Sequence, residues 1–154
     1  MLKAQDIMTK EPITLHPGDE IATAARIMIT RRINGLPVVD EAGSLVGIIT
    51  QSDLVAQQKT LSLPSVFTLF DGFVPLASMD KLEAEFKKIT AMTVAEAMSA
   101  DPAFVAPDTP LDKIAALMVD RQHHTLPVVD AGRLVGVVGK EDVIRTLIPG
   151  AAKA

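Results

Sequence analysis

The stretch "LPVVD" occurs twice in this chain, at residues 36–40 and again at residues 126–130. In each copy a proline precedes two β-branched valines, a composition that favours the beginning of a buried strand. Neither copy contains an obvious catalytic group. The recurrence decides the fold, because it indicates that a longer structural unit has been duplicated.

The duplication extends far on both sides of this pentapeptide. After a one-residue gap at Ala42, "GSLVG" aligns with "GRLVG", and Asp53 aligns with Asp142. Two copies are too few for a solenoid, so we expect them to pack face to face about a pseudo-two-fold axis, each supplying half of the core. The identical residues before the pentapeptide recur at one constant interval: Met8 and Met98, Pro12 and Pro102, Pro17 and Pro107, Ala25 and Ala115, Met28 and Met118.

The hydrophobic periodicity predicts the same order of elements in both copies. A short strand at 13–15 or 103–105 lies between two prolines. Two β-branched runs joined by a turn follow a first helix, and a second helix covers 51–59 or 140–147. The sequence therefore predicts an α+β fold of two β-α-β-β-α repeats, at 1–59 and 92–154, with an apolar linker at 60–91. The first helices have apolar residues at helical spacing: Ile21, Ala24, Ala25 and Met28, and Leu111, Ile114, Ala115 and Met118.

Composition excludes several classes of function. A chain of 154 residues with 48% hydrophobic and 22% charged residues is typical of a folded globular protein. The absence of cysteine excludes disulfides and thiolate nucleophiles. A net charge of -4, without Trp or Tyr, disfavours nucleic-acid binding. No apolar run reaches the roughly 20 residues of a membrane span, and the first residues do not resemble a signal peptide. We expect a soluble, cytoplasmic protein that does not bind a membrane.

The motifs together resemble a known family. The first copy contains "DIMTKEP", "RRINGLPVVD" and "GSLVGIITQSD", and the second contains "EAMSADP", "RQHHTLPVVD" and "GRLVGVVGKED". In this order they resemble a tandem pair of CBS domains, a Bateman module, over nearly the whole chain apart from about residues 60–91 and the last few. The resemblance implies a non-catalytic regulatory function in which AMP, ADP, ATP or S-adenosylmethionine binds in a cleft between the repeats. The ligand state would pass to an effector protein that the sequence does not identify.

The first copy carries the family's Gly, two apolar residues, Thr or Ser, two residues, Asp motif as "GIITQSD". Gly47, Thr50 and Asp53 supply its defined positions. A helix N-terminus offers N–H groups to a phosphate, the Thr50 hydroxyl adds a donor, and the Asp53 carboxylate accepts ribose hydroxyl protons. The same residues also form a variant capping box, which needs no ligand. Both interpretations stay open.

The second copy departs from this motif, because "GVVGKED" has Gly139 in place of the threonine. Asp142 keeps the ribose acceptor, and Lys140 supplies a charge for phosphate. The resemblance implies that each cleft joins this element of one repeat to the first strand and the segment before LPVVD of the other. Thr50 and Asp53 would face Ala103, Phe104, His123, His124 and Pro127. In the weaker cleft, Asp142 and Lys140 would face Ile13, Thr14, Ile33, Asn34 and Pro37.

The adjacent His123 and His124 suggest either a metal ligand pair or an acid–base pair. Neighbours in an extended segment point to opposite sides, and neither a cysteine nor a suitably spaced carboxylate cluster accompanies them. We therefore predict no metal site and no enzyme activity, and consider contact with a ligand phosphate or exposure in a loop. Arg31 and Arg121 end their helices, where a cation suits the helix dipole.

The linker at 60–91 is more apolar than a simple connection needs to be. Met79–Ile89 has the pattern of an amphipathic helix. Such a segment packs either within a homodimer or on its own chain, and we predict a homodimer. Because Gly139 lacks the motif hydroxyl, the alternative function is a ligand-free interaction or scaffold module of the same fold. The linker holds four of the five phenylalanines: Phe67, Phe70, Phe73 and Phe86.

Overall fold

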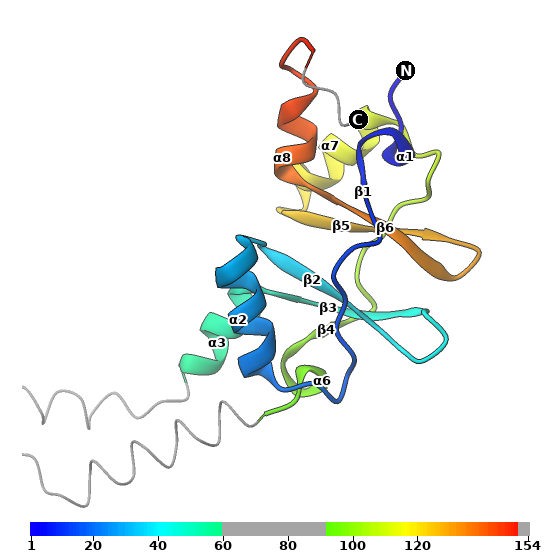
Figure 1. The fold of residues 1–154 in the computed structure, drawn as a ribbon. Helices are drawn as coiled ribbons and strands as arrows, with labels where there is room; N and C mark the ends of the chain where they lie inside the picture. The colour runs from blue at the N-terminus through cyan, green and yellow to red at the C-terminus, as the bar shows by residue number, and fades with distance from the viewer. Residues whose placement is uncertain (60–91, 151–154) are drawn as a thin grey trace, which may run out of the picture.

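The structure, a computed structural model, describes residues 1–59 and 92–150. They form two halves with the same arrangement of elements, each with a three-stranded antiparallel sheet (Figure 1). The predicted α+β fold of two pseudo-symmetric repeats is confirmed. The first repeat contains α1 (Ala4–Ile7), β1 (Thr9–Lys10), α2 (Ile21–Arg31), β2 (Gly35–Val39), β3 (Leu45–Thr50) and α3 (Gln51–Gln58). The second contains α6 (Val94–Ala97), β4 (Ser99–Ala100), α7 (Leu111–Asp120), β5 (Thr125–Asp130), β6 (Arg133–Gly139) and α8 (Lys140–Arg145).

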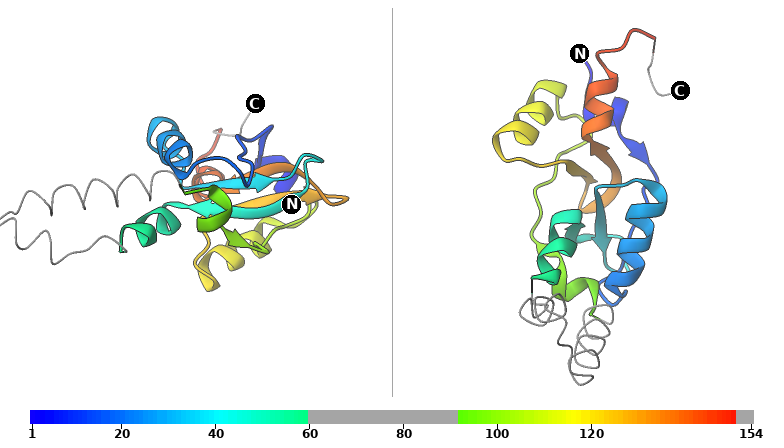
Figure 2. Two further views of the ribbon diagram at one scale, coloured as in Figure 1. Left: turned by 90° about the horizontal axis from the view of Figure 1, so that it is seen from below. Right: turned by 90° about the vertical axis from the view of Figure 1, so that its left-hand side faces the viewer.

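The two LPVVD copies form the strands that begin each hairpin. β2 pairs with β3, and β5 pairs with β6, with a register irregularity between Val38 and Val39 and between Val128 and Val129. All five residues of β2 are buried. Seen from below, the strands of both halves form a central layer with helices on either side (Figure 2). The duplicated pentapeptide is therefore the centre of the fold.

The beginning of each repeat completes the sheet of the other repeat. β1 pairs with β6, and β4 pairs with β3, so the strand orders are β1-β6-β5 and β2-β3-β4. The helix before each of these strands lies in the same half as its strand. Ala4 and Ile7 of α1 pack in the core of the second half, and Val94 and Ala97 of α6 pack in the core of the first. Figure 1 shows β1 beside β6 and α6 in the half that contains α2. Neither repeat has its complete sheet or core without the other.

Two equivalent glycines allow these exchanged segments to approach closely. A Cβ atom at Gly47 would lie 2.5 Å from Met98 Sδ and 3.0 Å from the Ser99 carbonyl oxygen. A Cβ atom at Gly136 would meet the side chain of Met8 and the carbonyl oxygen of Thr9 in the same way. The glycine of each "LVG" sequence is thus explained by a backbone approach rather than by turn geometry.

Each half has its own hydrophobic core, built largely from the predicted residues. Both clusters combine the inner face of the first helix with the LPVVD strand and the strand after it. The first contains Leu15, Ile21, Ala24, Met28, Leu36, Val38, Ile49, Val94 and Ala97. The second contains Ala4, Ile7, Val105, Ile114, Met118, Leu126, Val128 and Val138.

The predicted strands at 13–15 and 103–105 are extended but form only one bridge each. Leu15 bridges Val38, and Val105 bridges Val128, both in parallel orientation. A proline two residues later lacks the N–H group that would continue the ladder. The predicted linker helix and phenylalanines lie outside the described residues. No helix in the described part of the chain is long and apolar enough to cross a membrane.

Candidate functional site

Two clefts lie where the two halves meet, beside the first residues of β2 and β5. At this junction a Cβ atom on Gly35 would lie 3.3 Å from Thr125 Oγ1. The Thr50 cleft, named for that residue, has a volume of about 680 Å³, and the Asp142 cleft has a volume of about 350 Å³. Both volumes are in the range of small-molecule sites. Asn34, Thr125 and Lys140 line both clefts and separate them.

The Thr50 cleft brings together four residues predicted from the sequence. Thr50 comes from the end of β3, and Ala103, His123 and His124 come from the other repeat. The other three predicted residues are not among its lining. Asp53 turns back to Thr50, Pro127 is fully buried within β5, and Phe104 lines a separate hollow on the surface. The sequence did not predict several further residues of this cleft: Gln51, Ser52, Asp101, Pro102 and Gln122.

Thr50 and Asp53 form the capping box that was one of the two open interpretations. The Asp53 N–H group donates to Thr50 Oγ1 at 3.3 Å, and the Thr50 N–H group donates to Asp53 Oδ2 at 2.8 Å. The Thr50 hydroxyl also lies 3.1 Å from Oδ2 as a donor. Within the described residues, Asp53 Oδ1 accepts no hydrogen bond. Capping therefore leaves one carboxylate oxygen for a ligand hydroxyl.

The Asp142 cleft assembles six of the predicted residues. Asp142 and Lys140 of α8 face Ile13, Ile33, Asn34 and Pro37 of the first repeat, whereas Thr14 is not among the lining residues. The sequence did not predict four charged residues of this cleft, although one of them directly precedes the predicted Ile33. These residues are Glu11, Arg32, Glu141 and Arg145, and Arg31, predicted only to suit a helix end, lines the cleft as well.

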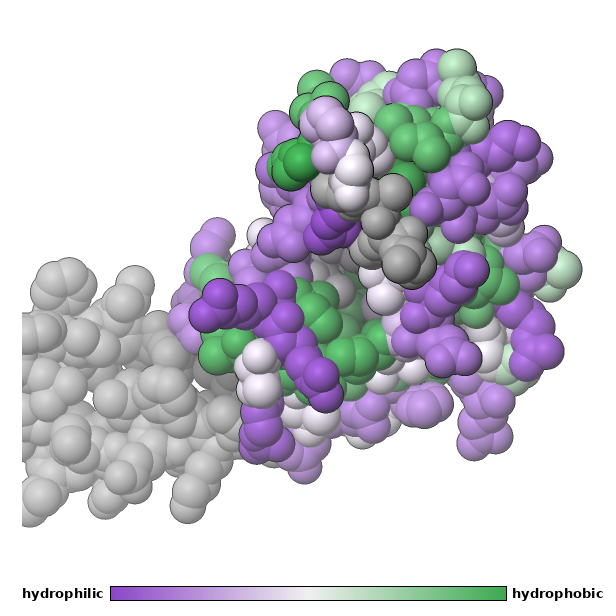
Figure 3. Space-filling view, turned by 45° about the horizontal axis from the view of Figure 1, so that its top comes forward, coloured by the Kyte–Doolittle hydropathy of each residue, from purple (hydrophilic) through white to green (hydrophobic). Residues whose placement is uncertain are grey.

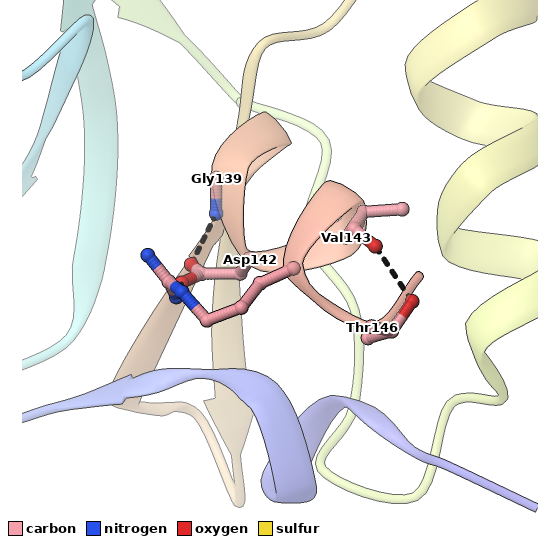
Figure 4. Close-up of polar contacts among 5 residues, drawn as sticks. Gly139, Asp142, Val143 and Thr146 are labelled. Atoms are coloured by element: carbon pink, nitrogen blue, oxygen red, sulfur yellow. Dashed lines mark hydrogen bonds and ion pairs between the residues drawn. The ribbon is translucent and has the colours of Figure 1, made fainter. Parts of the chain in front are cut away.

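Both carboxylate oxygens of Asp142 have partners, one at the end of β6 and one on α8. Asp142 is the one buried charged residue among the described residues, with 9% of the residue's surface exposed. The Gly139 N–H group donates to Oδ2 at 2.8 Å (Figure 4). Arg145 Nη1 donates to Oδ1 at 3.1 Å and forms an ion pair there. At the end of the helix, the Thr146 hydroxyl donates to the Val143 carbonyl (Figure 4).

Equivalent hydrogen bonds tie each LPVVD strand to the helix that follows its hairpin. The Asn34 carbonyl accepts from the Gln51 N–H group at 3.0 Å, and the His124 carbonyl accepts from the Lys140 N–H group at 3.1 Å. These bonds fix the segment before LPVVD at the mouth of the clefts. Among residues 1–59 and 92–150, no group of three or more His, Cys, Asp and Glu side chains is placed to hold a metal ion.

Comparison with known proteins identifies relatives along the whole chain. The family model described as CBS domain matches residues 4–59 and 94–149. An uncharacterized protein of Methanocaldococcus jannaschii is 33% identical over 154 residues, which are 94% of this chain and 90% of that protein. The chloroplastic CBS domain-containing protein CBSX2 of Arabidopsis thaliana is 28% identical, and the match covers 86% of this chain but 57% of CBSX2.

Solved structures share this fold. CBSX2 in complex with AMP has a TM-score of 0.72 and 25% sequence identity, with 96% of both chains covered. A CBS domain pair in complex with 5-methylthioadenosine and S-adenosyl-L-methionine has a TM-score of 0.71 and 31% identity, again with 96% of both chains covered. An L-aspartate semialdehyde sulfurtransferase of Methanocaldococcus jannaschii is 35% identical, but the match spans only 22% of that enzyme.

Proposed function

This chain belongs to the CBS domain family as a tandem pair, and we propose that it is a non-catalytic regulatory module that binds an adenosine nucleotide between its repeats. The ligand is AMP, ADP, ATP or S-adenosylmethionine. The observation that carries the proposal is that both clefts are lined by residues of both repeats. A ligand seated there contacts both halves at once. Its binding energy therefore depends on how the halves are arranged, which is the physical basis of a sensor.

The chemistry of the lining supports an adenosine ligand. Ala103 and Pro102 in one cleft, and Ile13 and Ile33 in the other, supply apolar surface for a base. Lys140 lines both clefts and supplies a cation for phosphate. The related structures in complex with AMP, and with 5-methylthioadenosine and S-adenosyl-L-methionine, support the same ligand class.

We also propose that the module is a cytoplasmic homodimer that acts on a separate effector protein. The helices expose large apolar side chains at equivalent positions of the two repeats, such as Ile29 with 77% and Val119 with 75% of their surface exposed. Val55 and Ile144 form a second equivalent pair, and Leu147 is 80% exposed. Figure 3 shows apolar patches on both halves of the molecule. Exposed apolar surface on helices of both repeats favours contact with a second copy.

The alternative proposal is a scaffold of the same fold that binds no ligand. Two observations favour it: Asp53 already caps α3, and Gly139 removes the hydroxyl from the second motif. Under this alternative the carboxylates of Asp53 and Asp142 have only structural roles, and the clefts between the halves bind no ligand.

Isothermal titration of the protein with AMP, ADP, ATP and S-adenosylmethionine tests the choice. We expect saturable binding of at least one compound. Chromatography of the sample after the titration should show that the bound compound is chemically unchanged. If none of the four binds, the scaffold alternative replaces the sensor. If a bound compound is converted to a product, the non-catalytic assignment is wrong.

A further inference from the structure

The two clefts occupy equivalent positions in the two repeats but differ in charge. The Thr50 cleft has neutral Gln122 at the end of the first helix and neutral Gln51 and Ser52 on the second helix of its own motif, where the Asp142 cleft has Arg32, Lys140 and Glu141. Arg31 also lines the Asp142 cleft, whereas its equivalent Arg121 lines a separate hollow. The differing pairs are Arg32 for Gln122 and Glu141 for Ser52; Lys140 is equivalent to Gln51 but lines both clefts, and Arg145 is equivalent to Ala56, which does not line the Thr50 cleft.

The ion pair between Asp142 and Arg145 is neutral as a unit, so the other charged residues set the net charge of this cleft. It compensates the carboxylate that points into the Asp142 cleft. Within the described residues, Arg31, Arg32 and Lys140 take part in no ion pair, so only the exposed Glu11 and Glu141 oppose them. Arg145 is 36% exposed and uses one donor on Asp142, and a guanidinium group has five. The cleft thus offers cationic donors at three separate places on its wall.

We propose that the Asp142 cleft selects the more anionic adenine nucleotides, the di- and triphosphates over the monophosphate, and that Arg32 and Arg145 set this preference. The inference rests on the proposed function. Each additional phosphate adds charge and acceptor oxygens, and guanidinium groups bind such oxygens with paired, charge-assisted hydrogen bonds. The Thr50 cleft has Gln122 at the position of Arg32 and no lining residue at the position of Arg145, and it does not discriminate by phosphate number.

Titrations with ATP and AMP on four forms of the protein test this proposal. The forms are the wild type, Arg32→Gln, Arg145→Ala and the control Arg121→Gln. Gln122 has φ 55° where Arg32 has φ 54°, so glutamine fits the backbone at position 32. Arg121→Gln removes the same charge from a helix end outside both clefts. In the wild type we expect ATP to bind at least about tenfold more tightly than AMP, the effect of one charge-assisted hydrogen bond.

Both cleft variants should lower this ATP-to-AMP ratio at least about threefold, and Arg121→Gln should leave it at the wild-type value. Equal affinity for ATP and AMP in the wild type would overturn the inference but not the proposed function. A ratio that survives Arg32→Gln and Arg145→Ala, or that falls as much in Arg121→Gln, would overturn it as well. If Arg145→Ala does not fold, Arg32→Gln decides alone. If neither nucleotide nor S-adenosylmethionine binds the wild type, the proposed function fails and the inference fails with it.

Discussion

Thr50 and Asp53 cap α3 reciprocally, with the Asp53 N–H group 3.3 Å from Thr50 Oγ1 and the Thr50 N–H group 2.8 Å from Asp53 Oδ2. In the second repeat the Asp142 carboxylate makes the equivalent bond to the Gly139 N–H group at 2.8 Å, without a hydroxyl partner. Each carboxylate therefore stabilises its helix before any ligand binds. A test of ligand binding must separate these two roles.

Replacing Asp53 measures the structural role by itself. Asp53→Ala removes the acceptor for the Thr50 N–H group and should lower the free energy of unfolding by about 1 kcal/mol in the absence of nucleotide. Urea unfolding followed by circular dichroism measures the difference. Gln58→Ala, at the exposed end of the same helix, is the control. Equal stability of the two variants would mean that the capping box contributes nothing.

The close approach of the exchanged segment at Gly47 predicts a larger cost. Gly47→Ala places a methyl group against Met98 and the Ser99 carbonyl oxygen, so we expect a loss of about 1–3 kcal/mol, as for other overpacked sites. Gly18→Ala is the matched control, because its Cβ atom would meet nothing within 4 Å. Thermal unfolding of both variants gives the comparison. Unchanged stability of Gly47→Ala would contradict the packing of Met98 over β3.

Glu96 makes the stability of the protein depend on pH. The Thr93 N–H and hydroxyl groups both donate to its Oε1 atom at 3.0 Å, and these hydrogen bonds hold the pKa of Glu96 below its ordinary value. The stabilisation is fully present above the ordinary glutamate pKa of about 4.3 and is lost as the pH falls through the lower pKa of the folded state. Wild type and Glu96→Gln should differ in free energy of unfolding at neutral pH and converge in acid. A difference that stays constant from neutral to acid pH would contradict this account.

Introducing charge at exposed apolar residues on α8 and directly after it tests the homodimer. Ile144→Asp and Leu147→Asp should each shift the protein toward monomer, because an unpaired charge is costly in an apolar contact. Light scattering of the variants, beside a wild-type dimer, reports the change. Phe104→Asp, which alters an exposed side chain of a separate hollow, should leave the dimer intact. Dimers in both the Ile144 and the Leu147 variants would place the interface elsewhere. A role for Phe70 and Phe73 stays a prediction for residues outside the described part.

The repeats and their order could be predicted from the sequence because both signals are local. The LPVVD copies give the hairpins, and the spacing from Ile21 to Met28 gives the first helix and its buried face. The exchange of α1 and β1 into the other half could not be predicted, because short segments pair with distant partners without a periodic signal. The structure shows the exchange at two equivalent contacts, of Met8 with Gly136 and of Met98 with Gly47.

The candidate site was predicted less completely. The predicted segment of Ile33 and Asn34 lines a cleft, because the resemblance assigns whole segments to the clefts; whether these residues bind a ligand stays a prediction. Which side chains of a segment line a cleft depends on rotamer and local bonding. Asp53 therefore turns toward Thr50, and the LPVVD proline at 127 is buried within its strand. The ion pair between Arg145 and Asp142 was not predicted. It depends on the three-residue spacing of the two side chains along α8, and the sequence had suggested a role only for the first turn of that helix.

The most direct test of the account is the melting temperature of a doubly blocked protein with and without nucleotide. Ser52→Trp and Glu141→Trp each place a large side chain in one cleft, at exposed positions outside both cores. A nucleotide at 100 times its dissociation constant should stabilise the wild type by about 2.7 kcal/mol, which raises the melting temperature by roughly 5 to 10 °C. Gln58→Trp, outside both clefts, should keep this rise, and the double variant should lose it. A full rise in the double variant, or none in the wild type with AMP, ADP, ATP or S-adenosylmethionine, would contradict nucleotide binding between the repeats.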